Sequence, residues 1–340
     1  GYEWALKELR RAATEDDQAT HRSRSALANA YRELRYGGSG VWSAKAEGLM
    51  SRVKGDEALP ESRLVPVVLA LTEGKLTEAD KLIAEHRESM GDKVGPETLF
   101  LEGEILRMRS PPNPEATDEQ RKKLEAQRKE AEKKLLKAIA ARPAFQRAMY
   151  SLAVLEELGG RPDKARDLLR KILKREPTHS GAALALGRIL LEKREYKDAV
   201  EVLAAPVSDK FENAPAKQRA LAHHLRAKLF LRMNKGAKAE EELSLALKHD
   251  PENLAAMEDR AEHYRRKGQC KQMFKAYQDL QTIGKDDADT RIGMIKARLC
   301  IGQKGEANKL VDSGIKDFPQ DARFRYYQGL LFIKSGRMDE

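Results

Sequence analysis

The sequence predicts an all-α solenoid, a row of stacked antiparallel helix pairs with no β-sheet. A pattern of bulky and small apolar residues returns about every 34 residues along the chain. Within each copy the apolar residues recur at the spacing of an amphipathic helix, and no alternating run typical of a strand exceeds a few residues. A period of this length indicates helix pairs that bury their apolar faces by stacking on their neighbours.

The composition agrees with a thin stack of helices. Charged residues make up 35% of the chain and aromatic residues 6%. A large globular core would need more aromatic side chains, whereas a stack two helices thick exposes more surface. We therefore interpret the 340 residues as one long array and not as two ordinary domains.

The clearest copy of the pattern covers residues 146–177. Small residues at Ala153 and Ala165 allow the two helices to approach where they cross, and neighbouring leucines fill the space beside them. A Gly-Gly pair followed by Pro162 separates the helices, because proline is tolerated at the first position of a helix. Pro177 then ends the second helix and turns the chain into the next pair.

The N-terminal part, residues 1–143, carries degenerate copies. The expected elements are a lone second helix at 2–14, a hairpin at 20–53 with a longer loop at Gly37, Gly38 and Gly40, a hairpin at 62–90, and a hairpin at 97–142.

The hairpin at 97–142 contains an insertion. Its small crossing residues, Gly103 and Ala131, are 28 residues apart, whereas Ala153 and Ala165 are 12 apart. The extra residues, at about 110–127, begin with a proline-rich helix stop and continue with a capping-type helix start and added turns of charged helix. This segment is either a solvated extension or a docking arm.

The C-terminal part, residues 144–340, is a regular array. Its expected elements are hairpins at 146–177, 180–205, 218–249, 254–283 and 288–317, a longer connector at about 206–215, and a closing first helix at 322–335. The segments 2–14 and 322–335 each lack the other helix of a pair, so we expect both ends to be cut from a longer chain.

These spacings resemble the tetratricopeptide repeat. The resemblance is carried by the copy at 146–177, by the small residues Gly187 and Ala227, and by the run Leu245–Asn253, which is similar to the end of such a repeat. It covers nearly the whole chain, is strongest between 146 and 284, and implies a right-handed superhelix without an active site. The family's first helices line a concave groove that holds a partner.

The resemblance implies which side chains face that groove, because repeat positions 2, 5, 9 and 12 of each first helix point into it. The candidate groove residues are Arg147, Tyr150, Arg188, His224, Lys228, Arg232, Arg265, Lys296, Arg323 and Tyr326. They combine cations with tyrosines, residues that supply directed hydrogen bonds and contact area at interfaces. We expect a peptide with carboxylates and one or two apolar anchors, bound extended or as a helix.

The net charge of +10 also favours acidic partners. Nucleic acid is the less favoured partner, because Glu157, Glu258 and Glu262 interrupt the groove and no aromatic platform for stacking bases is visible.

The sequence contains no motif for catalysis. No phosphate-binding glycine loop, zinc-protease motif or nucleophile elbow occurs, so we expect no enzyme, no cofactor and no metal site. No stretch of 18 apolar residues could span a membrane. Cys270 and Cys300 are interpreted as small packing residues, with a bridge between adjacent repeats as the alternative. This favours a reduced compartment, the cytoplasm, with the periplasm as the alternative.

The sequence thus predicts a non-enzymatic scaffold or adaptor for a partner protein, of bacterial style, in motility, pilus, secretion or envelope assembly. One alternative is the regulatory arm of an enzyme whose catalytic domain lies outside these residues. A second alternative is RNA binding.

Overall fold

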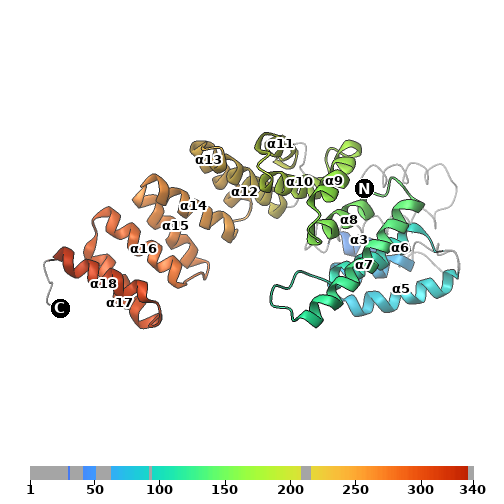
Figure 1. Ribbon diagram of the computed structural model, residues 1–340, viewed down its shortest axis with the longest axis horizontal. Coiled ribbons are helices and arrows are strands. Elements are labelled where there is room, and N and C mark those ends of the chain that lie inside the picture. The colour runs from blue at the N-terminus through green and yellow to red at the C-terminus, as the bar shows by residue number, and fades with distance from the viewer. Residues whose placement is uncertain (1–29, 31–40, 51–62, 92–93, 208–215, 336–340) are drawn as a thin grey trace. The chain divides into compact units, whose positions relative to one another are not determined.

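The computed structural model describes Ala30 and residues 41–50, 63–91, 94–207 and 216–335. In this part of the chain every regular element is a helix, and no strand is present (Figure 1). The prediction of an all-α fold without a β-sheet is confirmed for these residues. The lone helix predicted at 2–14, the loop at 37–40 and most of the connector at 206–215 lie outside them.

The chain divides into two compact units, residues 1–182 and 183–340, called unit 1 and unit 2 below. This boundary separates regions of dense internal packing. The boundary predicted after residue 143 separates degenerate from regular repeats, and it stays a prediction.

In unit 1 the helices pair in chain order. They are α3 (Val41–Met50), α4 (Leu64–Thr72), α5 (Leu76–Met90), α6 (Pro96–Arg109), α7 (Asp118–Ala141), α8 (Gln146–Leu158) and α9 (Pro162–Arg175). The pairs are α4 with α5, α6 with α7 and α8 with α9, and the first helices α4, α6 and α8 also contact one another in sequence. Residues 110–127 form the loop between α6 and α7 and the first turns of α7.

The crossing of α6 and α7 is as close as the small residues predict. A Cβ on Gly103 would lie 2.9 Å from Leu135 Cγ and 3.3 Å from the carbonyl oxygen of Ala131, so a larger residue would push the helices apart. Ala131 and Leu135 are fully buried. The predicted partnership of Gly103 and Ala131 is confirmed despite the long loop between them.

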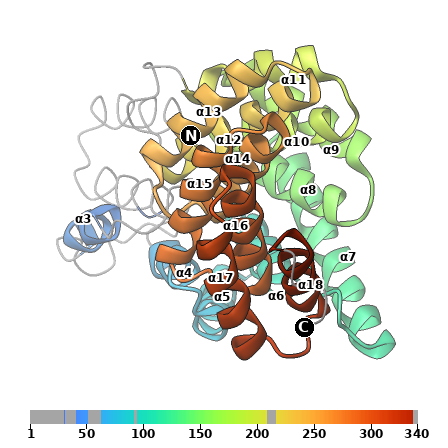
Figure 2. The same ribbon diagram turned by 90° about the vertical axis from the view of Figure 1, so that its left-hand side faces the viewer.

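Unit 2 continues the same pattern. Its helices are α10 (Ser180–Glu192), which begins just before the boundary, α11 (Tyr196–Val202), the 3-10 helix η3 (Ala205–Val207), α12 (Ala216–Arg232), α13 (Gly236–His249), α14 (Leu254–Lys267), α15 (Cys270–Thr282), α16 (Ala288–Ile301), α17 (Lys304–Asp317) and α18 (Ala322–Ser335). Each helix from α12 to α18 packs on the next, so that α14 to α17 lie side by side in order (Figures 1 and 2).

The short turn inside each of six described hairpins contains one residue with a left-handed backbone. These residues are Gly74, Gly160, Arg194, Asn234, Gly268 and Gly302. At Gly160 the turn closes with two backbone hydrogen bonds, from Gly160 N to Glu157 O at 3.0 Å and from Arg161 N to Glu156 O at 2.8 Å. This is the Schellman motif, which favours glycine because a Cβ disfavours positive φ.

Cys270 and Cys300 form a disulfide, with their Cα atoms 5.7 Å apart. This separation lies in the usual range for bridged cysteines. Cys270 begins α15, the second helix of one hairpin, and Cys300 lies near the end of α16, the first helix of the next. The interpretation as two separate packing residues was therefore wrong, and the alternative of a bridge between adjacent repeats is what the structure contains.

Candidate functional site

The ten candidate groove residues all lie on first helices, as expected, but they are divided between the two units. Unit 1 holds Arg147 and Tyr150 on α8; unit 2 holds Arg188 on α10, His224, Lys228 and Arg232 on α12, Arg265 on α14, Lys296 on α16, and Arg323 and Tyr326 on α18. In unit 2 the first helices α12 and α14 contact each other directly. A single groove joining all ten residues stays a prediction.

Helix α12 carries two neighbouring cations without an acidic partner. Lys228 and Arg232 are one helical turn apart, Lys228 half-buried and Arg232 exposed. Neither forms an ion pair with another residue in the described part of the chain. Because no carboxylate neutralises them there, these two side chains are available to an anionic group of a partner.

His224, on the same helix, has a structural role in the fold. Its side chain is buried, and its Nε2 is 2.7 Å from Asp259 Oδ2 on α14. A hydrogen bond to a carboxylate between two first helices fixes their separation and leaves little of the ring for a partner.

Two of the other candidate cations are bound by carboxylates of the protein itself. Arg265 donates two hydrogen bonds to Glu262, at 2.5 and 2.7 Å. These bonds, together with Arg266, lower the pKa of Glu262 to about 2 although partial burial opposes the shift. Arg323 likewise donates to Asp321 and Asp289. These arginines therefore offer a partner less net charge than the sequence suggested.

The sequence did contain a signal for this internal pairing. Glu262 stands three residues before Arg265, a spacing that places the two side chains together on one face of a helix. Glu262 was counted against nucleic acid as a partner, but the same spacing also predicts that Glu262 neutralises Arg265.

The two candidate tyrosines differ in exposure. Tyr326 is 65% exposed and meets Tyr327 edge to face, with the ring centroids 5.3 Å apart. Tyr150 is half-buried against His179, and Gly181 approaches its ring so closely that a Cβ there would lie 3.3 Å from it. Tyr326 therefore presents an apolar surface to a partner, whereas most of Tyr150 packs inside unit 1.

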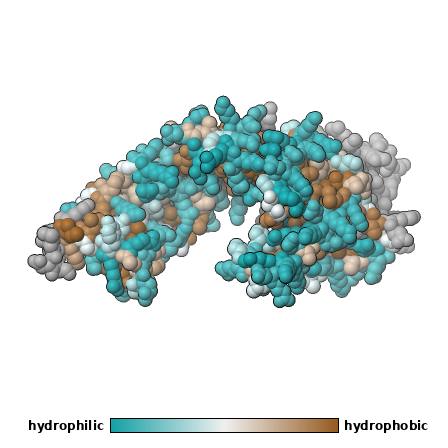
Figure 3. All heavy atoms as spheres, viewed as in Figure 1, coloured by the Kyte–Doolittle hydropathy of each residue, from teal (hydrophilic) through white to brown (hydrophobic). Residues whose placement is uncertain are grey.

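The three remaining candidate residues differ in their exposure. Arg147 is half-buried, and Arg188 and Lys296 are exposed. Hydrophilic residues cover most of the face drawn in Figure 3, with hydrophobic patches between them. The described residues contain no group of three or more His, Cys, Asp or Glu side chains placed to hold a metal ion. None of the described helices combines the length and the apolar character needed to cross a membrane.

The chain matches family models of the tetratricopeptide repeat. One model matches residues 158–229, and a second matches residues 126–180 and 224–287. No curated protein matches the sequence significantly.

Solved structures share the fold at low sequence identity. PilF of Pseudomonas aeruginosa is 17% identical, with a TM-score of 0.53 over 69% of this chain and 96% of that one. PilW, a type IV pilus biogenesis factor, is 15% identical, with a TM-score of 0.50 over 66% of this chain and 98% of that one. The helical hairpins and the two family models together identify residues 126–287 as tetratricopeptide repeats.

Proposed function

We propose that this protein is a non-enzymatic scaffold that binds an acidic segment of a partner protein along the first helices of unit 2. The tetratricopeptide repeat is generally a non-catalytic fold that binds proteins, which supports the class of function. The observation that carries the proposal is the pair of cations on α12, Lys228 and Arg232, which form no ion pair with another described residue.

The chemistry of the neighbouring positions supports an acidic partner with apolar anchors. Lys296 on α16 is exposed and forms no ion pair with a described residue, and Tyr326 on α18 offers an exposed ring. Complementary charge speeds association and selects among partners, while a buried ring supplies contact area. A partner segment with spaced carboxylates and an aromatic or aliphatic side chain would complement both the cations and the exposed ring.

The test is affinity capture from a bacterial lysate, with mass spectrometry, using two matched variants. Lys228→Glu combined with Arg232→Glu inverts the charge of the pair on α12. Lys271→Glu with Lys275→Glu makes the same change in charge at the same spacing on α15, a second helix, where both lysines are exposed. We expect the first variant to lose proteins that wild type and the second variant retain, with helicity and melting unchanged.

Equal loss of captured proteins by both variants would indicate a nonspecific effect of charge. Equal retention would show that the groove of unit 2 is not the binding surface.

RNA binding is the competing function. It predicts a steep loss of RNA affinity with rising salt. Glu258, which pairs with Lys285, and Glu262 place negative charge among the candidate positions and disfavour it.

The cellular system in which the scaffold acts is a more specific proposal than the binding function itself. The shared fold of PilW, a pilus biogenesis factor, makes pilus assembly the first system to examine, beside motility, secretion and envelope assembly in a bacterium. The identity of the captured proteins tests this choice. A regulatory role beside a catalytic domain outside these residues would instead be recognised from the full-length chain.

For localisation, the cytoplasm is the proposal from the sequence. The Cys270–Cys300 disulfide supports the alternative, the periplasm, because disulfides persist in oxidising compartments. Treatment of intact cells with a thiol-alkylating reagent distinguishes the two compartments. If Cys270 and Cys300 react only after a reductant is added, the disulfide is present and the periplasm is indicated. If they react without a reductant, the cytoplasm is indicated.

A further inference from the structure

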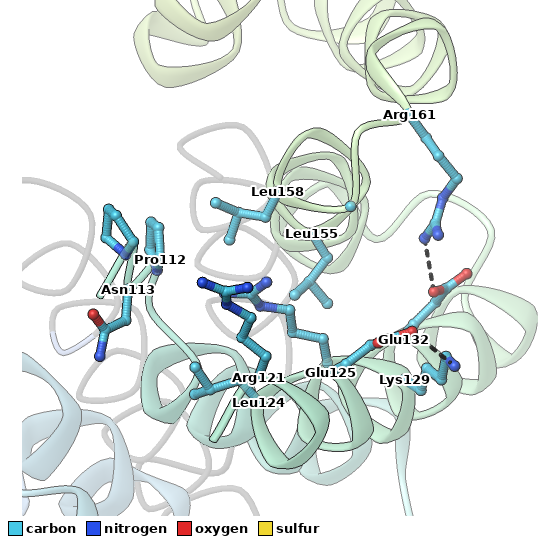
Figure 4. A pocket seen from close by; sticks show the side chains of 13 residues that line it. Pro112, Asn113, Arg121, Leu124, Glu125, Lys129, Glu132, Leu155, Leu158 and Arg161 are labelled. Atoms are coloured by element: carbon cyan, nitrogen blue, oxygen red, sulfur yellow. Dashed lines mark hydrogen bonds and ion pairs between the residues drawn. The ribbon is translucent and has the colours of Figure 1, made fainter. Parts of the chain in front are cut away.

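The insertion between α6 and α7 forms one wall of a pocket in unit 1. The pocket has a volume of about 600 Å³ and is lined by the loop at 112–114, the first turns of α7, and the end of α8 with the turn that follows it (Figure 4). This volume lies in the range of ligand sites in proteins. The lining side chains of α8, Leu155 and Leu158, are not at the positions assigned to the groove.

Hydrogen bonds of the protein itself hold the pocket walls in place. A capping box between Thr117 and Gln120 fixes the start of α7. Arg128 on α7 donates from Nε to the carbonyl of Ser110 at 3.1 Å and from Nη2 to the carbonyl of Pro111 at 3.0 Å, which ties the loop to the helix. These hydrogen bonds hold the inserted loop in a defined position against α7.

Arg161 closes the opposite side of the pocket. It donates to Glu132 on α7 at 2.9 Å and also to Glu156 on α8. Its guanidinium passes so close to Gly159 that a Cβ at that position would lie 3.3 Å from it. Pro112 and Asn113 lie at one side of the pocket, and Glu132 and Arg161 lie at the other (Figure 4).

The floor of the pocket is apolar. Leu155 is buried, Leu124 and Leu158 are half-buried, and the three come from α7 and α8. An apolar side chain of a ligand placed here would lose water on several sides, which is a favourable contribution to binding.

The rim of the pocket carries an excess of positive charge. Of its four cations, Lys129 is paired with Glu125 and Arg161 with Glu132. Arg128 donates to carbonyl groups, and no carboxylate in the described part of the chain forms an ion pair with it. Among the described residues, the only ion pair of Arg121 is with Asp118 at 3.6 Å, between side chains that are 62% and 93% exposed, and such surface pairs contribute little. Figure 4 shows the Arg121 side chain directed from α7 toward Leu155 and Leu158.

We propose that this pocket is a second docking site, which binds a linear peptide segment with a carboxylate next to an apolar side chain. The apolar side chain packs on Leu124, Leu155 and Leu158, and the carboxylate accepts hydrogen bonds from Arg121. The weakly compensated charge of Arg121 and Arg128 selects the acidic group, and the leucine floor selects its neighbour. The site is independent of the groove proposed in unit 2.

The test selects peptides from a phage-displayed library of random linear sequences. The bait is the full chain carrying Lys228→Glu and Arg232→Glu, so that the groove proposed in unit 2 does not contribute. We expect enrichment of peptides in which Asp or Glu adjoins Leu, Ile or Phe. The affinity of an enriched peptide is then measured by fluorescence anisotropy for the bait and for further variants of it.

Arg121→Glu should lower the affinity roughly tenfold or more, because a charge-assisted hydrogen bond is replaced by repulsion. Leu158→Ser should weaken binding without changing the preference for acidic peptides. Lys122→Glu is the matched control, since it makes the same charge change one residue further on α7 at an exposed position outside the pocket lining. Failure to enrich such peptides, or equal affinities for the Arg121→Glu and Lys122→Glu variants, would overturn the proposal. Neither result would bear on the proposal that the groove of unit 2 binds a partner, because the bait already carries the variant of that groove.

Discussion

The two units bury charge in different ways. In unit 1 the buried carboxylates Glu97, Glu104 and Glu156 each accept hydrogen bonds from an arginine. In unit 2 two buried histidines on α12 also bond to carboxylates: His223 bonds to Glu242 at 2.7 Å, beside a bond from Arg226, and His224 bonds to Asp259 at 2.7 Å. Arginine stays charged at any physiological pH, whereas histidine gains or loses its charge near neutrality.

This difference shows that one repeat architecture accepts two kinds of polar link between its helices. In unit 1, Glu104 on α6 accepts hydrogen bonds from Arg107 on the same helix and from Ser151 on α8 at 2.6 Å, and the bond from Ser151 joins α6 to α8. The links of unit 2 from α12 use imidazole rings, and a disulfide joins α15 to α16. The units should therefore respond differently to mutation, reduction and acid.

The largest effect is expected from breaking the buried pair in unit 1. Glu104→Ala removes the partner of Arg107 and leaves a largely buried guanidinium unpaired, which costs roughly 3 kcal/mol or more of the free energy of unfolding. Amide hydrogen exchange should locate the loss in α6 and α8. Replacing both residues with leucine should cost less, because no charge is left unpaired; if the double variant is no more stable than the single one, the interpretation of the pair is wrong.

Reduction should affect unit 2 next most strongly. Cys270→Ser with Cys300→Ser removes a link across 30 residues, and loss of such a disulfide typically costs about 2–4 kcal/mol. Denaturant unfolding of the oxidised protein should show higher stability than that of the double variant. Reduced wild type should match the variant, and identical unfolding of the oxidised and reduced forms would contradict a stabilising role.

Acid should weaken α13 and α14 of unit 2 before it weakens the contacts of Glu104 in unit 1. Burial, and then Lys267, lowers the pKa of His263 below its ordinary value of 6.5, and burial followed by His223 lowers the pKa of His249. Below pH 6.5 the unfolded chain therefore binds more protons than the folded one, so the stability of unit 2 falls as pH decreases.

The corresponding change at Glu104 in unit 1 requires stronger acid. Burial alone would raise the pKa of Glu104, but Arg107 and Ser151 outweigh it and hold the pKa below 4.5. Its contribution is present above pH 4.5 and is lost as pH falls further. Hydrogen exchange at about pH 7.5 and about pH 5.5, on either side of the ordinary histidine pKa, should show loss of protection in α13 and α14 before α6 and α8. The variant His249→Gln with His263→Gln should flatten this dependence, and an unchanged slope would exclude these histidines as its source.

The smallest effects are expected at the left-handed turns. Nothing lies within 4 Å of a Cβ added to Gly160, so Gly160→Ala should cost only the backbone strain of positive φ, about 1 kcal/mol. Arg194→Gly should relieve the same strain in unit 2, with part of the gain offset by the greater freedom of glycine in the unfolded chain. Melting temperatures measure both, and a stabilising Gly160→Ala would contradict this account.

The sequence predicted the elements that depend on local chemistry. The small residues Gly103 and Ala131 identified a helix crossing across a long insertion, and Thr117 with Gln120 identified the start of α7. Periodicity was enough for these features because each depends on backbone geometry or on packing within one hairpin.

Sequence spacing did not decide the contacts between hairpins, and it gave the bridge between Cys270 and Cys300 only as an alternative. His224 and Asp259 are 35 residues apart, and Cys270 and Cys300 are 30 apart, so each pair meets only because consecutive hairpins stack in one register. That Arg121 lines one pocket with the leucines of α8 likewise depends on how the inserted turns pack, which no period describes.

The order in which the helices pack also bears on how the protein folds. Within each unit the main contacts join a helix to the next one along the chain or to the next but one. Searching for distant partners is what slows the folding of many proteins, and chains dominated by local contacts fold faster. We therefore expect each hairpin that emerges during synthesis to find its N-terminal neighbour already present, so that assembly proceeds from the N-terminus without waiting for the C-terminus.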